Sequence, residues 1–328
     1  MTVSSGGPPE IAKLRYSVPA AAALAPIVSR EYELGSIECR FLHHGFNDTY
    51  EVKTGCSRYV LRLYRHGWRT EKNIIGELQL LSHLAEKELP VAAPIQKGNG
   101  KLYFSIKCPE GIRHGALFKL ASGEPAHDVK EDQLADLGHL LGRLHRLCDE
   151  WGEKIDRPTL NGSSLVAEPL SYLETAFPHR IQRIRELGFE LTAVRSIDAT
   201  VIKQAPVFGL VHGGFLIENL HCDNGAFTLI DFDYCAYGYR LYDLGTFKWS
   251  LMKHDGLEAS AHFSHFLKQY TKVFPIEPQL LRLIDDFVAV RELWDWSTQV
   301  KWGDDTRRLT DYDFDQHCTR LEKLLLGN

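Results

Sequence analysis

The sequence lacks the features that mark several classes of protein. It contains no Cys-x-x-Cys pair, and an odd number of scattered cysteines indicates neither a zinc site nor a disulfide framework. The seven cysteines are Cys39, Cys56, Cys108, Cys148, Cys222, Cys235 and Cys318. The alanine-rich stretch 18–28 is too short to span a bilayer and is interrupted by Pro19 and Pro26.

Neither sign of charge dominates. Lys and Arg number 38 against 43 Asp and Glu, which gives a net charge of -5. Charge therefore provides no reason to expect nucleic acid or a membrane as a partner. The first nine residues are small, polar and rich in Pro and Gly, without the basic start and apolar run of a signal peptide. These features predict a cytoplasmic protein.

The order of expected elements predicts an α+β protein of two lobes. Residues 1–30 are expected to form a leader and a short helix with Ser17 at its N-cap. Residues 31–120 are expected to form a strand-rich lobe, with strands at 37–42, 49–53, 58–64, 102–106 and 116–120 and a helix at 70–87. Residues 121–328 are expected to form a mostly helical lobe, with helices at 132–148, 171–186, 193–203, 259–273, 278–300 and 312–326.

One segment, residues 210–247, contains most of the polar residues that are candidates for a functional site. His212-Gly213-Gly214 leads to Asn219, and twelve residues later Asp231 ends an apolar run. Asp223-Asn224-Gly225 predicts a turn, and the resulting hairpin would bring Asn219 and Asp231 side by side. An amide oxygen beside a carboxylate suits Mg²⁺. On spacing alone, an ordinary turn asparagine and strand-end aspartate explain the pair equally well.

Taken together, this segment resembles the catalytic loop of the aminoglycoside phosphotransferase and choline kinase-like enzymes. The matching elements are His212-Gly213, Asn219, Ile230-Asp231-Phe232-Asp233 and Tyr242-Asp243-Leu244. The resemblance covers roughly residues 30 to 300 and implies a protein-kinase-like fold with a β-rich N-lobe and a larger, mostly α C-lobe. It also implies that Asn219 and Asp231 hold Mg²⁺ on the phosphates of ATP or GTP. His212 and Asp243 would belong to the catalytic loop, with Asp243 bracing it.

The N-terminal half matches the same family in its nucleotide-binding residues. Arg62 resembles the basic residue that reaches the α- and β-phosphates, and Glu77 resembles its acidic partner. Arginine in place of lysine would bind phosphate as a planar fork instead of a point charge. Asn47 belongs to a degenerate phosphate-covering turn, and the stretch from Phe118 to Leu120 resembles the hinge that meets the base.

The resemblance fails at Gly214, where the family carries its catalytic aspartate. That aspartate accepts or orients the proton of the attacking hydroxyl, and glycine can do neither. Three explanations are open: an introduced Asp-to-Gly change, a natural pseudoenzyme, or another carboxylate, Glu218 or Asp233, taking the role.

The predicted function is ATP- and Mg²⁺-dependent transfer to the hydroxyl of a small molecule, weak or absent because of Gly214. The alternative is a pseudokinase-like protein that binds a nucleotide or metabolite. Asp233, Arg291, Trp294 and Asp295 are candidates for the acceptor site, although at least one tryptophan of this region is expected in the core. By resemblance the acceptor is an aminoglycoside, amino alcohol or hydroxy-amino acid, and a sugar or choline-like alcohol fits equally. Protein kinase activity is disfavoured by the short stretch between Asp231 and Asp243.

Overall fold

The computed structural model describes residues 14, 16–127, 129–191, 207–254, 259–302 and 310–326. The chain divides into two compact units. The first, here called the sheet unit, comprises Met1–Ile75 and Ala93–Leu120. The second, the helical unit, comprises Gly76–Ala92 and Ala121–Asn328. The helix predicted at 193–203 lies outside the described residues.

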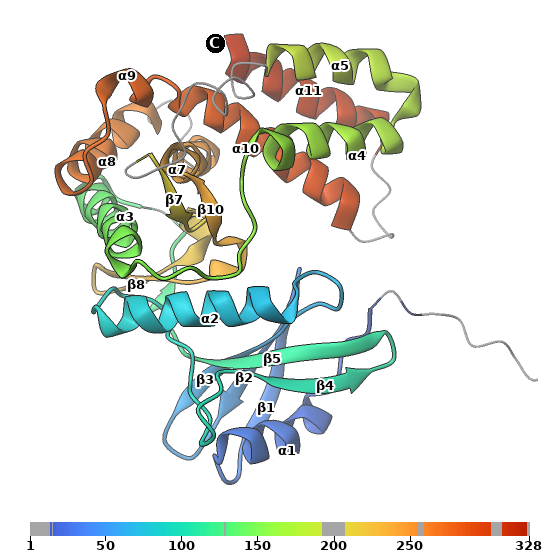
Figure 1. The fold of residues 1–328 in the computed structure, drawn as a ribbon, viewed down its shortest axis with the longest axis vertical. Coiled ribbons are helices and arrows are strands. Elements are labelled where there is room, and N and C mark those ends of the chain that lie inside the picture. Colours follow the sequence, from blue (N-terminus) through green and yellow to red (C-terminus); the bar gives the residue numbers. More distant parts are fainter. Residues whose placement is uncertain are drawn as a thin grey trace, which may run out of the picture. The chain divides into compact units, whose positions relative to one another are not determined.

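The sheet unit is built on a five-stranded antiparallel sheet in the order β1-β2-β3-β5-β4 (Figure 1). Its strands are β1 (Glu38–His44), β2 (Asp48–Lys53), β3 (Arg58–Leu63), β4 (Phe104–Cys108) and β5 (Gly111–Lys119). Two helices accompany them, α1 (Ala21–Tyr32) and α2 (Glu71–Glu86), and the division between the two units falls within α2. All five predicted strands are present: β2 and β3 lie within one residue of their predicted bounds, β1 and β4 within two, and β5 begins five residues before its predicted start.

Alternation along the strands gives the sheet one apolar face. Tyr50, Val52, Leu61 and Leu63 form a buried core with Leu24 and Val28 of α1. Side chains alternate along a strand, so Arg62 lies on the opposite face from Leu61 and Leu63. The apolar face thus packs on α1, while the other face carries the residue predicted to bind phosphate.

The predicted N-cap of α1 was wrong. The helix begins at Ala21, and no side chain caps it. Ser17 is instead held by tertiary contacts: its hydroxyl donates to Glu110 Oε2 at 2.8 Å and its carbonyl accepts from Arg113 Nη1 at 2.7 Å. These bonds fix residue 17 against the β4–β5 turn, ahead of the first helical turn.

The helical unit contains short strands among its helices. The strands are β6 (Glu124–Pro125), β7 (Phe208–Val211), β8 (Leu220–Asp223), β9 (Ala226–Leu229) and β10 (Ala236–Tyr239). The longer helices are α3 (Glu131–Trp151), α4 (Glu168–Ala176), α5 (Ile181–Glu190), α7 (Arg240–His254), α8 (Ala259–Val273), α10 (Ile284–Trp302) and α11 (Asp311–Leu326). Shorter turns of helix are η1 (Ser163–Ala167), η2 (Pro178–Arg180), η3 (Ile217–Asn219), η4 (Phe232–Tyr234) and α9 (Pro278–Leu281).

Two predicted helices are each interrupted in the structure, and one helix was not predicted. The predicted 171–186 helix is interrupted at Phe177, before Pro178, and the 278–300 helix is interrupted after Leu281. Helix α7 was missed because eleven of its residues are buried, so it shows no alternation of polar and apolar faces. None of the described helices is long and apolar enough to cross a membrane.

Close helix packing holds the centre of the helical unit. Helices α3 and α8 lie side by side (Figure 1). A Cβ atom on Gly138 of α3 would lie 2.2 Å from the carbonyl oxygen of Phe266 of α8. Only glycine allows the two backbones to approach this closely.

Candidate active site

A buried carboxylate organises the loop that follows β7. Asp243, in the first turn of α7, is fully buried. Its Oδ2 accepts from the backbone N–H of His212 at 2.7 Å, and its Oδ1 from that of Gly213 at 2.8 Å. His145 of α3 reaches Oδ2 through Nε2 at 3.0 Å. Three elements, the loop, α7 and α3, are thus joined at one side chain.

The protonation of this network follows from burial. Burial raises the pKa of Asp243, but hydrogen bonds from His145 and His212 outweigh it and hold the pKa below its ordinary value. Burial, followed by the charge of Arg240, lowers the pKa of His145 to about 4. The imidazole is therefore neutral at pH 7: Nε2–H donates to Asp243, and Nδ1 accepts from the Tyr270 hydroxyl at 2.8 Å.

The neutral imidazole predicts a loss of stability in mild acid. In the unfolded chain His145 takes up a proton near pH 6.5, whereas in the folded chain it does so only near pH 4. Stability should therefore fall as pH drops through this window, by about 2 kcal/mol between about pH 7.5 and 5 from this residue alone. Urea unfolding at the two pH values measures the loss. His145→Gln, which retains one donor and one acceptor without titrating, should show a correspondingly smaller loss; an equal loss would contradict the assignment.

His212 links the loop to the end of β9. Its Nδ1 lies 3.1 Å from the backbone N–H of Gly214, and its Nε2 lies 3.1 Å from the carbonyl of Ile230. An amide N–H only donates and a carbonyl only accepts, so the hydrogen resides on Nε2. The ring therefore joins Gly214 to Ile230, the residue before Asp231, through one hydrogen bond to each.

The two glycines of the loop meet different constraints. Gly213 has φ +76°, and a Cβ there would lie 2.2 Å from the carbonyl oxygen of Tyr234, so this position requires glycine. At Gly214 a Cβ would meet Asn219 Nδ2 at 3.6 Å, His212 Nδ1 at 3.7 Å and Tyr234 Cδ2 at 3.8 Å, all ordinary contacts. Position 214 therefore has room for a side chain, although it carries none.

The predicted hairpin brings the two candidate metal ligands to neighbouring strand ends. Leu220 of β8 pairs with Leu229 of β9, and the N–H of Ile230 donates to the Asn219 carbonyl at 3.0 Å. The Asn219 side chain donates through Nδ2 to the carbonyl of Gly214 at 2.9 Å. Asp231 adopts φ 61° and ψ 64°, a left-handed conformation that non-glycine residues adopt mainly at functional sites or turns.

Four of the predicted nucleotide-binding residues belong to the sheet unit. The Arg62 guanidinium lies over the ring of Phe118, 5.1 Å from its centroid, on the neighbouring strand β5. Asn47 is buried in the β1–β2 turn, and its Oδ1 accepts from the N–H of Arg65 at 3.1 Å. Leu120 is half-buried and follows directly after β5.

Glu77, the remaining member of that set, belongs to the helical unit. It is fully buried on α2, where its Oε2 lies 4.0 Å from Arg157 Nη1. Arg157 also donates through Nε to the carbonyl of Cys235 at 2.6 Å, just after η4. Glu77 thus contributes to an ion pair that reaches the segment following Asp231, and its predicted pairing with Arg62 remains a prediction.

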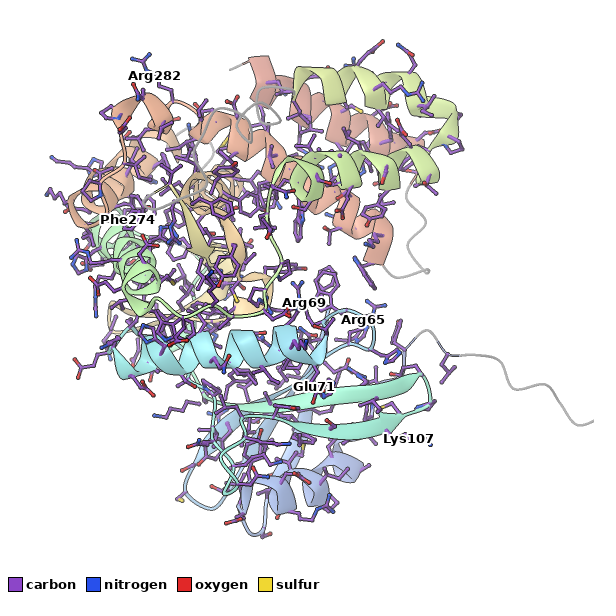
Figure 2. All side chains as sticks on the ribbon, viewed as in Figure 1. Arg65, Arg69, Glu71, Lys107, Phe274 and Arg282 are labelled. Atoms are coloured by element: carbon purple, nitrogen blue, oxygen red, sulfur yellow. The ribbon has the colours of Figure 1, made fainter. Side chains whose placement is uncertain are left out.

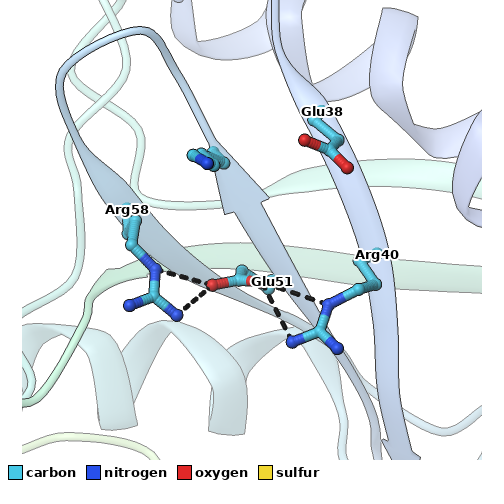
Figure 3. Close-up of a pocket in the computed structure, with 5 residues that line it drawn as sticks. Glu38, Arg40, Glu51 and Arg58 are labelled. Carbon is cyan, nitrogen blue, oxygen red and sulfur yellow. Dashed lines mark hydrogen bonds and ion pairs between the residues drawn. The ribbon is translucent and has the colours of Figure 1, made fainter.

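A cavity of about 270 Å³ lies on the same sheet face as Arg62 but does not include it (Figure 3). Its residues are Glu38, Arg40, Glu51, Lys53 and Arg58. Glu51 accepts from Arg58 Nε at 2.7 Å and from Arg40 Nε at 3.2 Å, and these bonds lower its pKa. Because the charges satisfy one another at an exposed surface, we assign no function to this cavity.

A second cavity of about 200 Å³ lies near the start of α2, and its lining includes Arg65, Arg69 and Arg113. Arg65 and Arg69 are labelled in Figure 2. Arg113 is buried and committed to structure. It pairs with Asp48 at 2.8 Å and donates to the carbonyls of Leu63 and Tyr64 at 2.9 Å each. These bonds tie β5 to the end of β3.

The candidate acceptor residues come together around Tyr234. The Tyr234 ring packs edge-on against Trp294, with centroids 4.9 Å apart. Arg291 lies over Trp294 at 4.8 Å and within 3.8 Å of Asp295. Asp233 is fully buried, and Trp296, five residues after Arg291 on α10, stacks on His317 in the core.

Sequence reasoning missed three residues that this site uses. Tyr234 and Trp249 each lie against predicted residues, and His145 holds Asp243. Tyr234 directly follows the matched Ile-Asp-Phe-Asp segment, which was the available signal. Trp249 lies on the helix that was not predicted.

Comparison with known proteins places this arrangement in a family. A sequence profile of the phosphotransferase enzyme family, APH, matches residues 38–273. A Synechocystis protein is 30% identical over 90% of this chain and 81% of its own length. Amicoumacin kinase of Bacillus subtilis is 24% identical, with 80% of each chain covered. A Salmonella typhimurium protein named serine/threonine protein kinase RdoA is 26% identical over 75% of this chain and 72% of its own.

The fold agrees with the sequence match. The solved structure of amicoumacin kinase hAmiN, in complex with AMP-PNP, Ca²⁺ and Ami, superposes with a TM-score of 0.77 at 21% identity. It covers 94% of this chain and 93% of its own. The predicted protein-kinase-like fold, a β-rich lobe with a mostly helical lobe, is therefore confirmed. The chain belongs to the phosphotransferase enzyme family.

Proposed function

We propose that the protein is a nucleotide- and Mg²⁺-dependent phosphotransferase that acts on the hydroxyl of a small molecule. The observation that carries the proposal is the loop braced by Asp243. It presents position 214 beside Asn219, at the strand end that leads to Asp231. Family membership supports the reaction class, and relatives that include an amicoumacin kinase support a small-molecule acceptor.

The residues fit a magnesium ion and not a metal that needs a full protein cage. The amide nitrogen of Asn219 is committed to Gly214, so its Oδ1 would be the oxygen that it contributes as a ligand, beside the Asp231 carboxylate. Among the described residues there is no group of three His, Cys, Asp or Glu side chains that could hold a metal. Mg²⁺ binds through one or two such oxygens, keeping its waters and the phosphates of the nucleotide. When bound, it neutralises charge on those phosphates.

The protein's own residues position the loop and the nucleotide, but residue 214 provides no base. Asp243, His145 and His212 fix the loop. The nucleotide-binding candidates of the sheet unit are Arg62, Asn47, Phe118 and Leu120, and Glu77 is the candidate of the helical unit. No carboxylate at 214 accepts the proton of the acceptor hydroxyl, and loss of a general base typically costs about 10² to 10⁴-fold in rate. We therefore propose that transfer by this sequence is weak or absent. Glu218 is no substitute, since it is exposed and bonded to Ser250 at 3.2 Å.

Binding of the nucleotide tests this proposal without requiring turnover. Thermal unfolding with ATP, GTP or AMP-PNP, each with and without Mg²⁺, should show Mg²⁺-dependent stabilisation. Ligand at 100 times its Kd contributes about 2.7 kcal/mol. Asp231→Asn should abolish the Mg²⁺-dependent part, because asparagine tolerates the left-handed backbone but lacks the charge.

The matched control is Asp223→Asn, an exposed carboxylate of the same hairpin, which should behave as wild type. The absence of any nucleotide-dependent shift would overturn the proposal. Nucleotide binding with no transfer to any acceptor, even after a base is restored at 214, would favour the pseudokinase alternative. Because one relative is named a protein kinase, the acceptor panel should include a protein substrate.

A further inference from the structure

Arg291 is a buried cation between two aromatic rings. Only 4% of the residue is exposed. Its guanidinium lies 5.2 Å from the centroid of Trp249 on α7 and 4.8 Å from that of Trp294 on α10. Such aromatic faces stabilise a guanidinium and orient its plane, but they accept none of its hydrogen bonds in the way that an oxygen does.

Half of the guanidinium fork has no partner among the described residues. Nε and Nη1 of Arg291 are buried, and no hydrogen-bond acceptor of the described residues reaches either. Asp295 approaches the remaining nitrogen, Nη2, at 3.8 Å, too far for a hydrogen bond. The Tyr242 hydroxyl is a hydrogen-bond partner of the guanidinium. Buried polar groups in folded proteins are almost always satisfied, and leaving a charged donor unsatisfied is costly. The two donors therefore call for an oxygen that the described residues do not supply.

Two aromatic rings in contact link the unsatisfied guanidinium to the reacting position. Trp294, which packs against Arg291, also contacts Tyr234 edge-on at 4.9 Å. The Tyr234 ring in turn lies 3.8 Å from the point where a Cβ at residue 214 would lie. All four residues belong to the helical unit. A molecule whose hydroxyl lay at position 214 and which extended past Tyr234 would approach Arg291.

We propose that Arg291 selects the acceptor, and that the acceptor is a small alcohol bearing a carboxylate. The inference rests on the proposed phosphotransferase function and deepens it by naming the substrate class. Nε and Nη1 lie on different edges of the guanidinium, and each forms a fork with Nη2. A carboxylate presents two oxygens in the geometry that matches one of these forks, and such bidentate pairs are the strongest hydrogen bonds available to arginine. The partly exposed Asp295, whose side chain is 26% accessible, provides a neighbouring anion for an amino group. A hydroxy-amino acid would use both.

The alternative acceptor classes fit this environment less well. An amino alcohol or a choline-like cation would bring a positive charge toward a buried guanidinium and leave both donors unsatisfied. A neutral sugar would supply oxygens but no compensating charge. Discrimination should therefore follow the carboxylate and not the amino group.

Matched pairs of probes that differ only by a carboxylate test this. Calorimetric titration in the presence of Mg²⁺ and AMP-PNP would compare L-serine with ethanolamine, L-threonine with isopropanolamine, D-glycerate with ethylene glycol and glucuronate with xylose. At least one carboxylated member should bind about 10- to 100-fold more tightly than its partner, as expected for hydrogen bonds to a charged group. Equal binding, or no binding, across all pairs would overturn the inference.

Substitutions at Arg291 assign the preference to this side chain. Arg291→Met removes the fork, and Arg291→Lys keeps the charge without the bidentate geometry. Both should retain Mg²⁺–nucleotide binding while losing most of the carboxylate preference, with lysine retaining the larger share. The matched control, Arg282→Met, changes an exposed arginine just before α10 (Figure 2) and should leave the preference intact.

The outcomes separate the two proposals. If nucleotide binds and the carboxylate preference survives in both Arg291 variants, Arg291 is not the selecting residue and the inference fails alone. If nucleotide does not bind to the wild type, the phosphotransferase proposal fails, and the inference fails with it.

Discussion

Replacing Gly214 with aspartate should raise the rate of nucleotide-dependent phosphorylation of an acceptor by about 10² to 10⁴-fold. The gain is expected because the new carboxylate would accept the proton of the attacking hydroxyl. The fold admits the side chain: the three nearest atoms to a Cβ at this position lie at 3.6 to 3.8 Å, which is ordinary contact. The backbone of Gly214 also lies outside the left-handed region that Gly213 occupies.

The measurement is consumption of ATP against the acceptor panel, with Gly214→Asn as the matched control. Asparagine has the shape of aspartate but cannot take up the proton, so it should show no comparable gain. An equal gain for both variants would mean that shape and not proton transfer limits the wild-type protein. If neither variant consumes ATP while nucleotide still binds, the protein is a binding protein and not a phosphotransferase.

Removing the Asp243 carboxylate should destabilise the protein by about 3 to 5 kcal/mol, as expected for breaking a buried charged network. Asp243→Ala leaves the N–H groups of His212 and Gly213 and the Nε2–H of His145 buried without their acceptor. Each unsatisfied donor costs about 1 to 3 kcal/mol. Urea unfolding measures the loss.

Asp285→Ala is the matched control for Asp243. Asp285 also belongs to a helix of the helical unit, but its side chain is 66% exposed and pairs only with Lys248. Its removal should cost less than about 1 kcal/mol. A comparable loss for both variants would show that Asp243 does not brace the loop. If Asp243→Ala unfolds the protein outright, the milder Asp243→Asn permits the same comparison.

Local patterns in the sequence predicted the sheet unit well. Its strands are short, separated by turn residues, and alternate between apolar and polar side chains, as in β2, where Tyr50 and Val52 are buried and Lys53 is exposed. Such alternation survives in the folded protein because one face packs on α1 and the other does not. The hairpin of β8 and β9 was predicted for the same reason, from the turn at Asp223-Asn224-Gly225.

The pattern of apolar and polar residues did not predict an element that is buried on all sides. Helix α7 contributes Asp243 and Trp249 to the site, yet its buried residues include Arg240, Tyr242, Asp243, Thr246 and Ser250. A helix surrounded by protein needs no polar face, so the period of 3.6 residues disappears from its sequence. Similarly, nothing local distinguishes Arg291, which is buried between two tryptophans, from Arg282, which is exposed.

The sequence by itself determined the family, the two-lobe α+β organisation and the order of the catalytic elements, because these depend on residue identities at fixed spacing within one segment. It also contained Gly214 as a departure from that pattern. Only the tertiary structure decided that position 214 has room for a side chain, that Asp243 joins its own helix to the loop and to α3, and that half of the Arg291 fork has no acceptor among the described residues. These are properties of atoms brought together from distant parts of the chain, and packing and burial, which no local pattern records, determine them.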